Sequence, residues 1–159
     1  MHDIINRLRA KKADEGFTLI ELLVVVVIIG VLVAIAVPVY LNYRKGAADK
    51  SAQSDVRGAV SAIEQFYTDN GNTYPVTNKS TAGATSVGLA ATSGGTATQT
   101  ITLSDKTQLG YVRAADGLSY LVCGNNTGGS NKWYIYNSLS GGSVKASTAT
   151  SLNLDTCAP

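Results

Sequence analysis

Histidine and charged residues are scarce in this sequence of 159 residues. The single histidine is His2, so a hydrolase with a histidine base, or a metal site rich in histidine, is nearly excluded. Charged residues make up 15% of the chain, against about 25% in an ordinary soluble domain, and the formal net charge is +2. Because a balance so close to neutral provides no general basic field, we do not expect the protein to bind nucleic acid.

Candidate catalytic and metal-binding groups are also few. No two carboxylates have the spacing of an acid–base pair, and the sequence contains neither a Ser–Lys dyad nor a phosphate-binding loop. Oxygen ligands for calcium could come from four residues, which are Asp116, Asn125, Asn126 and Asp155. These four residues lack an ordered ligand pattern and are of the types that form turns. We therefore expect no enzyme, no cofactor and no metal site.

Polar, apolar and small residues are distributed unevenly along the chain. Residues 1–16 are mostly polar and contain four basic side chains, which are Arg7, Arg9, Lys11 and Lys12. Residues 17–41 contain one charged side chain, Glu21, whereas Gly, Ser, Thr and Asn are abundant from Thr68 onward. This order is typical of a targeting segment and a membrane anchor followed by a small exported domain.

The apolar run of residues 17–41 is long enough to span a membrane. A helix of this length extends roughly 37 Å, and the hydrocarbon layer is about 30 Å thick. The basic residues before the run predict a cytoplasmic amino terminus and an exported carboxyl side. The alternative is a secretory signal cleaved after Ala34-Ile35-Ala36, but the run exceeds a normal signal core and contains Glu21.

Glu21 requires an explanation, because an unpaired carboxylate in lipid is costly. One alternative is that its side chain reaches the headgroups from the membrane edge. The neighbouring residues favour a second explanation, in which Glu21 belongs to a short motif. The segment GFTLIE at 16–21 follows a basic leader and begins the apolar run. This segment resembles the processing motif of type IV pilins and pseudopilins, and the stretch at 66–75 resembles the helix exit of pseudopilins and of pilins from Gram-positive bacteria.

The resemblance implies a processing step and an assembly contact. A prepilin peptidase would cut between Gly16 and Phe17 and methylate the new amine of Phe17. In a filament, Glu21 would pair with the Phe17 amine of a neighbouring subunit and set the register between subunits. Gly30 and Pro38 would mark a segment that unwinds on assembly, since Pro38 cannot donate a helical hydrogen bond. The alternative is that Gly30 belongs to a small-residue face that packs between helices.

Helical periodicity continues beyond the membrane to about residue 69. Apolar residues recur at steps of three and four in 42–68, which predicts an amphipathic helix. Its apolar face includes Val56, Val60, Ile63 and Phe66, and the charged residues expected on its wet side are Arg44, Lys45, Lys50 and Asp55. Asn70-Gly71 is expected to end this helix.

The rest of the sequence predicts four short strands, at 98–103, 111–115, 120–123 and 132–137, which would form one small antiparallel sheet. With the exported half of the helix packed on that sheet, the fold is α+β and type IV pilin-like. Residues 77–100 are almost all Gly, Ala, Ser and Thr, so we expect a variable, mobile surface loop. The expected parts are a leader at 1–16, a membrane or filament-core helix at 17–41, an amphipathic helix at 42–70 and a β domain at 71–159.

Cys123 and Cys157 are the only cysteines, and both lie on the exported side. Two free thiols are one alternative, but an oxidising compartment favours a disulfide. The bond would hold the carboxyl terminus against the strand that carries Cys123. Carboxyl-terminal loops closed by cysteines recur among the pilins that this chain resembles.

The sequence as a whole predicts a structural subunit of a type IV pilus. Its precursor would cross the cytoplasmic membrane once, and copies of it would form an extracellular filament. Its other partners would be membrane lipid, the prepilin peptidase, an assembly ATPase and a platform membrane protein. One alternative is a major pseudopilin of a type II secretion or DNA-uptake system, and another is a membrane-anchored binding module or a secreted enzyme.

Overall fold

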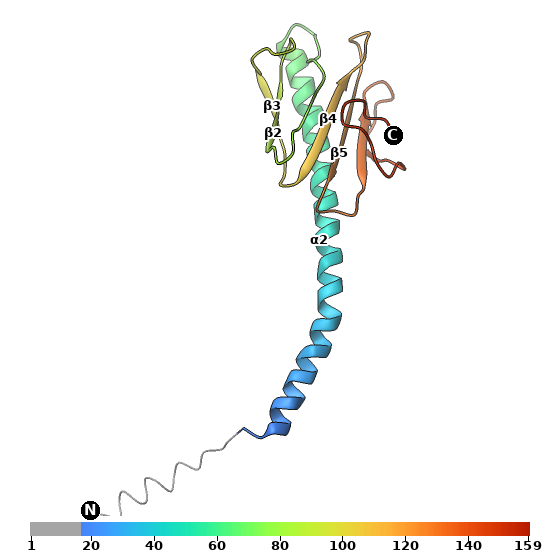
Figure 1. Cartoon of the computed structure of the whole chain (residues 1–159). Helices are drawn as coiled ribbons and strands as arrows, with labels where there is room; N and C mark the ends of the chain where they lie inside the picture. Colours follow the sequence, from blue (N-terminus) through green and yellow to red (C-terminus); the bar gives the residue numbers. More distant parts are fainter. Residues whose placement is uncertain (1–16) are drawn as a thin grey trace, which may run out of the picture. The chain divides into compact units, whose positions relative to one another are not determined.

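The computed structural model describes residues 17–159 (Figure 1). The expected leader at 1–16, which includes Gly16 of the expected cleavage site, lies outside the described residues. Among the residues described, one helix, α2 (Leu19–Asp69), precedes the strands, and it ends within a residue of the position expected from the periodicity. The chain divides into two compact units, one that ends at Tyr40 and one that runs from Leu41 to Pro159.

In the first unit, the described residues are helical from Leu19 onward and the helix continues through Gly30 and Pro38 without a break. Every side chain between residues 17 and 41 is exposed, because this unit offers no sheet or second helix among the described residues to cover it. The helix is long and apolar enough to cross a membrane. The apolar surface that the sequence predicts is therefore left exposed by residues 17–159.

The second unit contains a five-stranded antiparallel sheet in the order β1-β4-β5-β6-β7. A separate antiparallel hairpin consists of β2 and β3. The strands are β1 (Asn78–Lys79), β2 (Ser86–Leu89), β3 (Gln99–Thr102), β4 (Thr107–Arg113), β5 (Tyr120–Asn126), β6 (Trp133–Asn137) and β7 (Lys145–Ala146). Together with the helix, these strands confirm the predicted α+β fold.

The main core lies where the second half of α2 packs on the sheet. The helix residues that are completely buried are Ala52, Val56, Ala59, Ile63 and Phe66. They form one cluster with side chains of the sheet and of the β2–β3 hairpin. Full burial of each larger apolar side chain contributes about 1.5–3 kcal/mol, so this face accounts for much of the stability of the unit. At Gly124 an added Cβ would lie 3.0 Å from Cγ2 of Val56, so glycine allows the close approach of helix and sheet.

The sequence predicts that four strands form one sheet, and this predicted strand pairing is wrong. The strand expected at 98–103 is β3, and it pairs with β2 instead of joining the main sheet. The expectation of a mobile loop throughout 77–100 is also wrong, because β1 and β2 lie within it. Val87 and Leu89 of β2 are buried in the main core. These two apolar residues alternate as in a strand, but the small residues around them conceal the pattern.

The expectation that Asp55 faces water is wrong as well. Asp55 is 9% exposed and its carboxylate accepts hydrogen bonds from the backbone N–H and the hydroxyl of Ser104, both at 2.9 Å. Asp49, one and a half turns earlier, accepts bonds from the backbone N–H and hydroxyl of Ser130 in the same way. The two carboxylates therefore fasten the loops before β4 and β6 to the helix.

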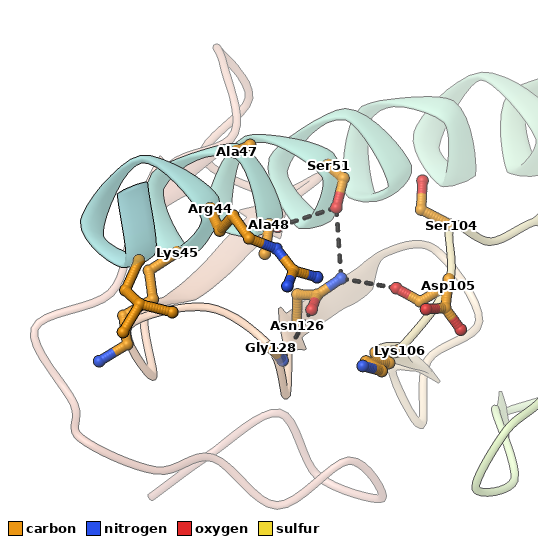
Figure 2. Close-up of a pocket in the computed structure, with 11 residues that line it drawn as sticks. Arg44, Lys45, Ala47, Ala48, Ser51, Ser104, Asp105, Lys106, Asn126 and Gly128 are labelled. Carbon is orange, nitrogen blue, oxygen red and sulfur yellow. Dashed lines mark hydrogen bonds between the residues drawn. The ribbon is translucent and has the colours of Figure 1, made fainter. Parts of the chain in front are cut away.

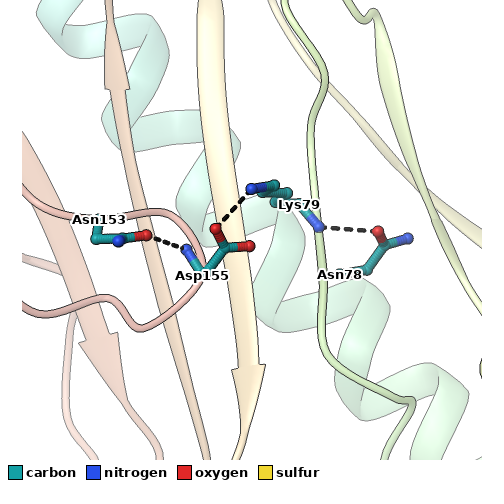
Figure 3. A network of polar contacts seen from close by, with 4 residues as sticks. All are labelled: Asn78, Lys79, Asn153 and Asp155. Carbon is teal, nitrogen blue, oxygen red and sulfur yellow. Dashed lines mark hydrogen bonds and ion pairs between the residues drawn. The ribbon is translucent and has the colours of Figure 1, made fainter.

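A smaller core lies around the predicted disulfide, which the structure confirms. Cys123 and Cys157 are bonded and their Cα atoms lie 5.5 Å apart. Trp133 and Leu152 are buried in the same cluster. The carboxyl-terminal segment is also held by an ion pair of 2.6 Å between Lys79 and Asp155 (Figure 3). The extreme end of the chain is thus fixed to the sheet at two points.

Candidate assembly site

The start of α2 is closed by a reciprocal pair of contacts between Thr18 and Glu21. The backbone N–H of Thr18 donates to Oε2 of Glu21 at 2.8 Å, and the Thr18 hydroxyl donates to the same oxygen at 2.5 Å. In return, the backbone N–H of Glu21 donates to the Thr18 hydroxyl oxygen at 3.3 Å. This arrangement is a capping box, which satisfies backbone donors that the first turn of a helix leaves unpaired.

The capping box gives Glu21 a partner within its own chain. Neither sequence-based explanation of Glu21, headgroup contact or pairing with a neighbouring subunit, included this contact. The signal was available, because Thr18 and Glu21 have the Thr-x-x-Glu spacing typical of a capping box before an apolar run. Thr18 is therefore the residue of this site that the sequence analysis missed.

Residues 17–41, which are the described residues of the first unit together with Leu41, form an exposed surface that we call the amino-terminal apolar surface. Phe17 is 75% exposed and Leu19 is 80% exposed. Apolar side chains surround the helix on all sides, which is typical of a helix buried in lipid or among other helices. Glu21 lies near the start of this surface, four residues after Phe17. Burial of the surface requires lipid or another protein.

Gly30 and Pro38 lie inside the continuous helix. An added Cβ at Gly30 would meet nothing within 4 Å, so packing within the chain does not require glycine there. Pro38 cannot donate a hydrogen bond to the carbonyl of Ala34. Unwinding of this segment on assembly stays a prediction.

The four residues considered as calcium ligands have structural positions in the second unit. Asp116 accepts a bond from the N–H of Leu118 within a turn, and Asp155 pairs with Lys79. Asn125 and Asn126 are buried in β5. Among residues 17–159, no group of three or more His, Cys, Asp or Glu residues could hold a metal ion.

Tyrosines surround the far end of the helix in the second unit. The Tyr120 hydroxyl donates to Oε1 of Glu64 at 2.6 Å, and the Tyr111 hydroxyl donates to the carbonyl of Pro75 at 2.9 Å. Burial is the main cause that raises the pKa of both tyrosines above the ordinary value. For Tyr120 the bond to the Glu64 carboxylate raises the pKa further. These hydroxyls are structural donors that stay protonated at neutral pH.

Comparison with known proteins finds a family match at the amino-terminal site. The family described as the prokaryotic N-terminal methylation motif matches residues 11–37. This match contains the GFTLIE segment and most of the amino-terminal apolar surface. The fimbrial protein EcpC of Eikenella corrodens is 34% identical over 104 residues, which cover 65% of this chain and 63% of that protein.

Two further relatives come from different filament systems. The type II secretion system core protein G of Escherichia coli strain K12 is 39% identical over 72 residues, which cover 45% of this chain and 49% of that protein. The type IV major pilin protein PilE1 of Neisseria gonorrhoeae is 39% identical over 67 residues, or 42% of this chain and 40% of that protein. This chain thus spans between 40% and 63% of the length of the three relatives. No solved structure matches it.

Proposed function

The chain is of the type IV pilin and pseudopilin family by its methylation motif and its relatives, and from that premise we propose that it is a structural subunit of a type IV pilus. The amino-terminal apolar surface is the observation that carries this proposal. Every apolar side chain between Leu19 and Leu41 is exposed, so the described residues do not bury the most hydrophobic segment of the chain. Lipid covers this surface in the precursor, and copies of the same helix cover it in the filament.

Processing prepares the subunit for assembly. A prepilin peptidase cuts between Gly16 and Phe17 and methylates the amine of Phe17, which then lies beside Thr18 and Glu21. The capping box holds the Glu21 carboxylate at the start of the helix, where the amine of a neighbouring subunit can reach it. Because both groups are charged, their pairing selects one register of helix against helix.

The other partners follow from the same mechanism. The precursor crosses the membrane once with its amino terminus in the cytoplasm, and its second unit is exported. An assembly ATPase and a platform membrane protein move subunits from lipid into the filament. Gly30 and Pro38 allow the helix to loosen between them as it is packed. The relatives have the names of structural proteins, which supports a subunit without catalytic activity.

Electron microscopy of filaments sheared from the cell surface, with mass spectrometry of their content, tests the proposal. We expect filaments in which this chain is a main component. Absence of the chain from all surface filaments, in cells that produce and process it, would contradict the proposal.

A second candidate function is that of a major pseudopilin. Core protein G of the type II secretion system, at 39% identity over 72 residues, supports this alternative as well as the pilin relatives support the first. Both functions use the same membrane anchor, but deletion of the gene would have a different effect on the cell in each case. Deletion of a pseudopilin gene abolishes protein secretion or DNA uptake, whereas deletion of a pilin gene removes long surface filaments. A membrane-anchored binding module or a secreted enzyme would leave both properties intact.

A further inference from the structure

A groove of about 470 Å³ opens beside the first turns of α2 that follow the apolar run (Figure 2). Arg44 and Lys45 line it from the helix, and Lys106 lines it from the turn before β4. Figure 2 shows Arg44 extending from the helix toward Asn126 and Gly128, with Lys106 on the strand side of the groove. All the lining residues belong to the second unit, so the groove forms within one compact body.

The charge of the groove favours an anion. Three of its lining side chains are cationic, and the carboxylate among them is that of Asp105. Lys45 and Lys106 are exposed at the groove. Basic residues directly on the exported side of a membrane span run against the usual bias, which places them on the cytoplasmic side. A solvated helix face therefore explains this cluster less well than a bound negative group does.

The floor of the groove is held in place before any ligand arrives. Asn126 is 3% exposed, and its amide nitrogen donates to Oγ of Ser51 at 3.2 Å, to the carbonyl of Asp105 at 2.8 Å and to Oγ1 of Thr107 at 3.1 Å. The Ser51 hydroxyl donates to the carbonyl of Ala48 at 2.8 Å. The helix and the turn that carries Lys106 are thus joined through Asn126. A ligand in the groove meets a surface that needs little reorganisation.

The position of the groove along the helix identifies the source of the anion. Leu41 is the last residue of the apolar run and also lines the groove. Arg44 follows three residues later, about 4.5 Å along the helix axis. The headgroup layer extends roughly 5–7 Å beyond the hydrocarbon core on each side. With Leu41 at the edge of that core, Arg44 and Lys45 lie at the depth of lipid phosphates.

We propose that this groove binds the phosphate group of an anionic phospholipid on the exported side of the membrane. The inference rests on the proposed membrane-anchored precursor and adds a specific lipid contact to it. Arg44, Lys45 and Lys106 surround the phosphate, and the floor around Asn126 limits how deeply it enters. The contact holds the exported unit at the membrane surface until assembly withdraws the helix from lipid.

Retention of lipid by the purified full-length chain tests the proposal. The chain is exchanged into mixed micelles that contain phosphatidylglycerol and phosphatidylcholine in equal amounts, and bound lipid is counted by native mass spectrometry. A basic side chain near anionic headgroups is worth about a fivefold change in binding. We therefore expect the preference for phosphatidylglycerol to fall about twenty-five-fold in the double variant Lys45→Gln/Lys106→Gln.

The matched control is Lys132→Gln/Lys145→Gln, which removes the same charge from exposed positions that do not line the groove. We expect it to retain phosphatidylglycerol as the unchanged chain does, and Trp133 fluorescence verifies that both variants are folded. Equal loss in the two double variants would reveal a bulk charge effect and overturn the proposal. So would equal retention of the two lipids by the unchanged chain.

Two further arms separate the lipid from other anions. Addition of inorganic phosphate to the micelles leaves the bound lipid in place if the headgroup is the ligand, whereas displacement of the lipid would assign the groove to free phosphate. If Lys45→Gln/Lys106→Gln keeps its lipid but fails to enter filaments, the groove is instead a contact between subunits. The lipid assay needs no filaments, so its failure is distinguishable from failure of the proposed pilus function.

Discussion

Glu21 has two roles to reconcile at the scale of single residues. In the isolated chain its Oε2 atom accepts two bonds from Thr18, which close the first turn of the helix. In the proposed filament the same carboxylate attracts the amine of a neighbouring Phe17. The two roles depend on different properties of the side chain, because a cap needs a hydrogen-bond acceptor and a subunit contact needs the charge.

Three substitutions separate these roles. Glu21→Ala removes both, so we expect normal membrane insertion but a loss of about tenfold or more in filament incorporation. Glu21→Gln keeps a capping acceptor and removes the charge, and we expect it to fail as Glu21→Ala does. Thr18→Val removes the hydroxyl contacts of the cap and keeps the charge, so it should assemble much better than either. The measurement is the ratio of filament to membrane protein on immunoblots of sheared and unsheared cells.

The Glu21→Gln result decides between the two explanations. Normal incorporation of this variant, together with failure of Thr18→Val, would mean that the cap is the whole role of Glu21. The account of register by charge pairing would then be withdrawn.

The buried tyrosines predict how stability depends on pH. The folded chain raises the pKa of Tyr111 and Tyr120, chiefly by burial, above the ordinary value near 10. Above that pH the unfolded chain releases phenolic protons that the folded chain retains, so the free energy of unfolding falls as pH rises. Below pH about 10 the contribution is fully present.

Chemical unfolding followed by Trp133 fluorescence between neutral pH and pH about 11 measures this loss. The variant Tyr120→Phe removes one titrating hydroxyl, so its stability should be lower at neutral pH by about 1 kcal/mol and should decline less steeply. An equally steep decline in the variant would remove Tyr120 from the explanation.

At the scale of elements, two glycines provide a test of how closely the helix packs on the sheet. At Gly124 an added Cβ would lie 2.9 Å from the carbonyl oxygen of Gln108 and 3.0 Å from Val56. At Gly58, on the exposed side of the helix, it would meet nothing within 4 Å. We expect Gly124→Ala to cost about 1–3 kcal/mol and Gly58→Ala to stabilise by up to about 1 kcal/mol.

Urea unfolding of the two variants in the same detergent gives both numbers. Their opposite signs are the essential outcome, because the substitution is chemically identical at the two positions. If Gly124→Ala proved as stable as Gly58→Ala, helix and sheet would not pack as closely as described.

The disulfide is the second element-scale device, since it holds the carboxyl-terminal segment on β5. The two cysteines are 34 residues apart in sequence. Cys123→Ala/Cys157→Ala is expected to lower the free energy of unfolding by about 4 kcal/mol, through the greater freedom of the unfolded chain. Thermal unfolding measures the change, with the reduced natural chain as a control for the lost sulfur atoms. A loss below about 1 kcal/mol would mean that other contacts, such as Lys79 with Asp155, hold the segment.

How far the sequence predicts these elements depends on the range of the contacts that decide them. The helix was predictable to within two residues at both ends, because its apolar periodicity and the Asn70-Gly71 stop are local signals. The pairing of β3 with β2 was not, because it depends on Val87 and Leu89 reaching a core formed by distant segments. The burial of Asp55 was hidden for the same reason, since its partner Ser104 is 49 residues away.

At the scale of the whole molecule, the chain consists of one unit with a buried apolar core and one whose described residues are all exposed. The unit from Leu41 to Pro159 buries apolar residues in two clusters, and Tyr43, Leu118 and Leu139 remain exposed. The amino-terminal apolar surface is exposed throughout. At the candidate site, the GFTLIE motif and the Thr-x-x-Glu spacing of the cap are local sequence signals, whereas the cationic groove depends on side chains from distant segments. The account of function rests on the uncovered surface becoming a filament contact after cleavage.

The mature amino terminus tests this account most directly. Mass spectrometry of the protein taken from the cell surface identifies its first residue and any modification of that residue. We predict a chain that begins at Phe17 with a methylated amine and retains the whole amino-terminal apolar surface. A chain that begins at Val37 would be a secreted protein without that surface, and one that begins at Met1 would be a plain membrane anchor; either result would contradict the account.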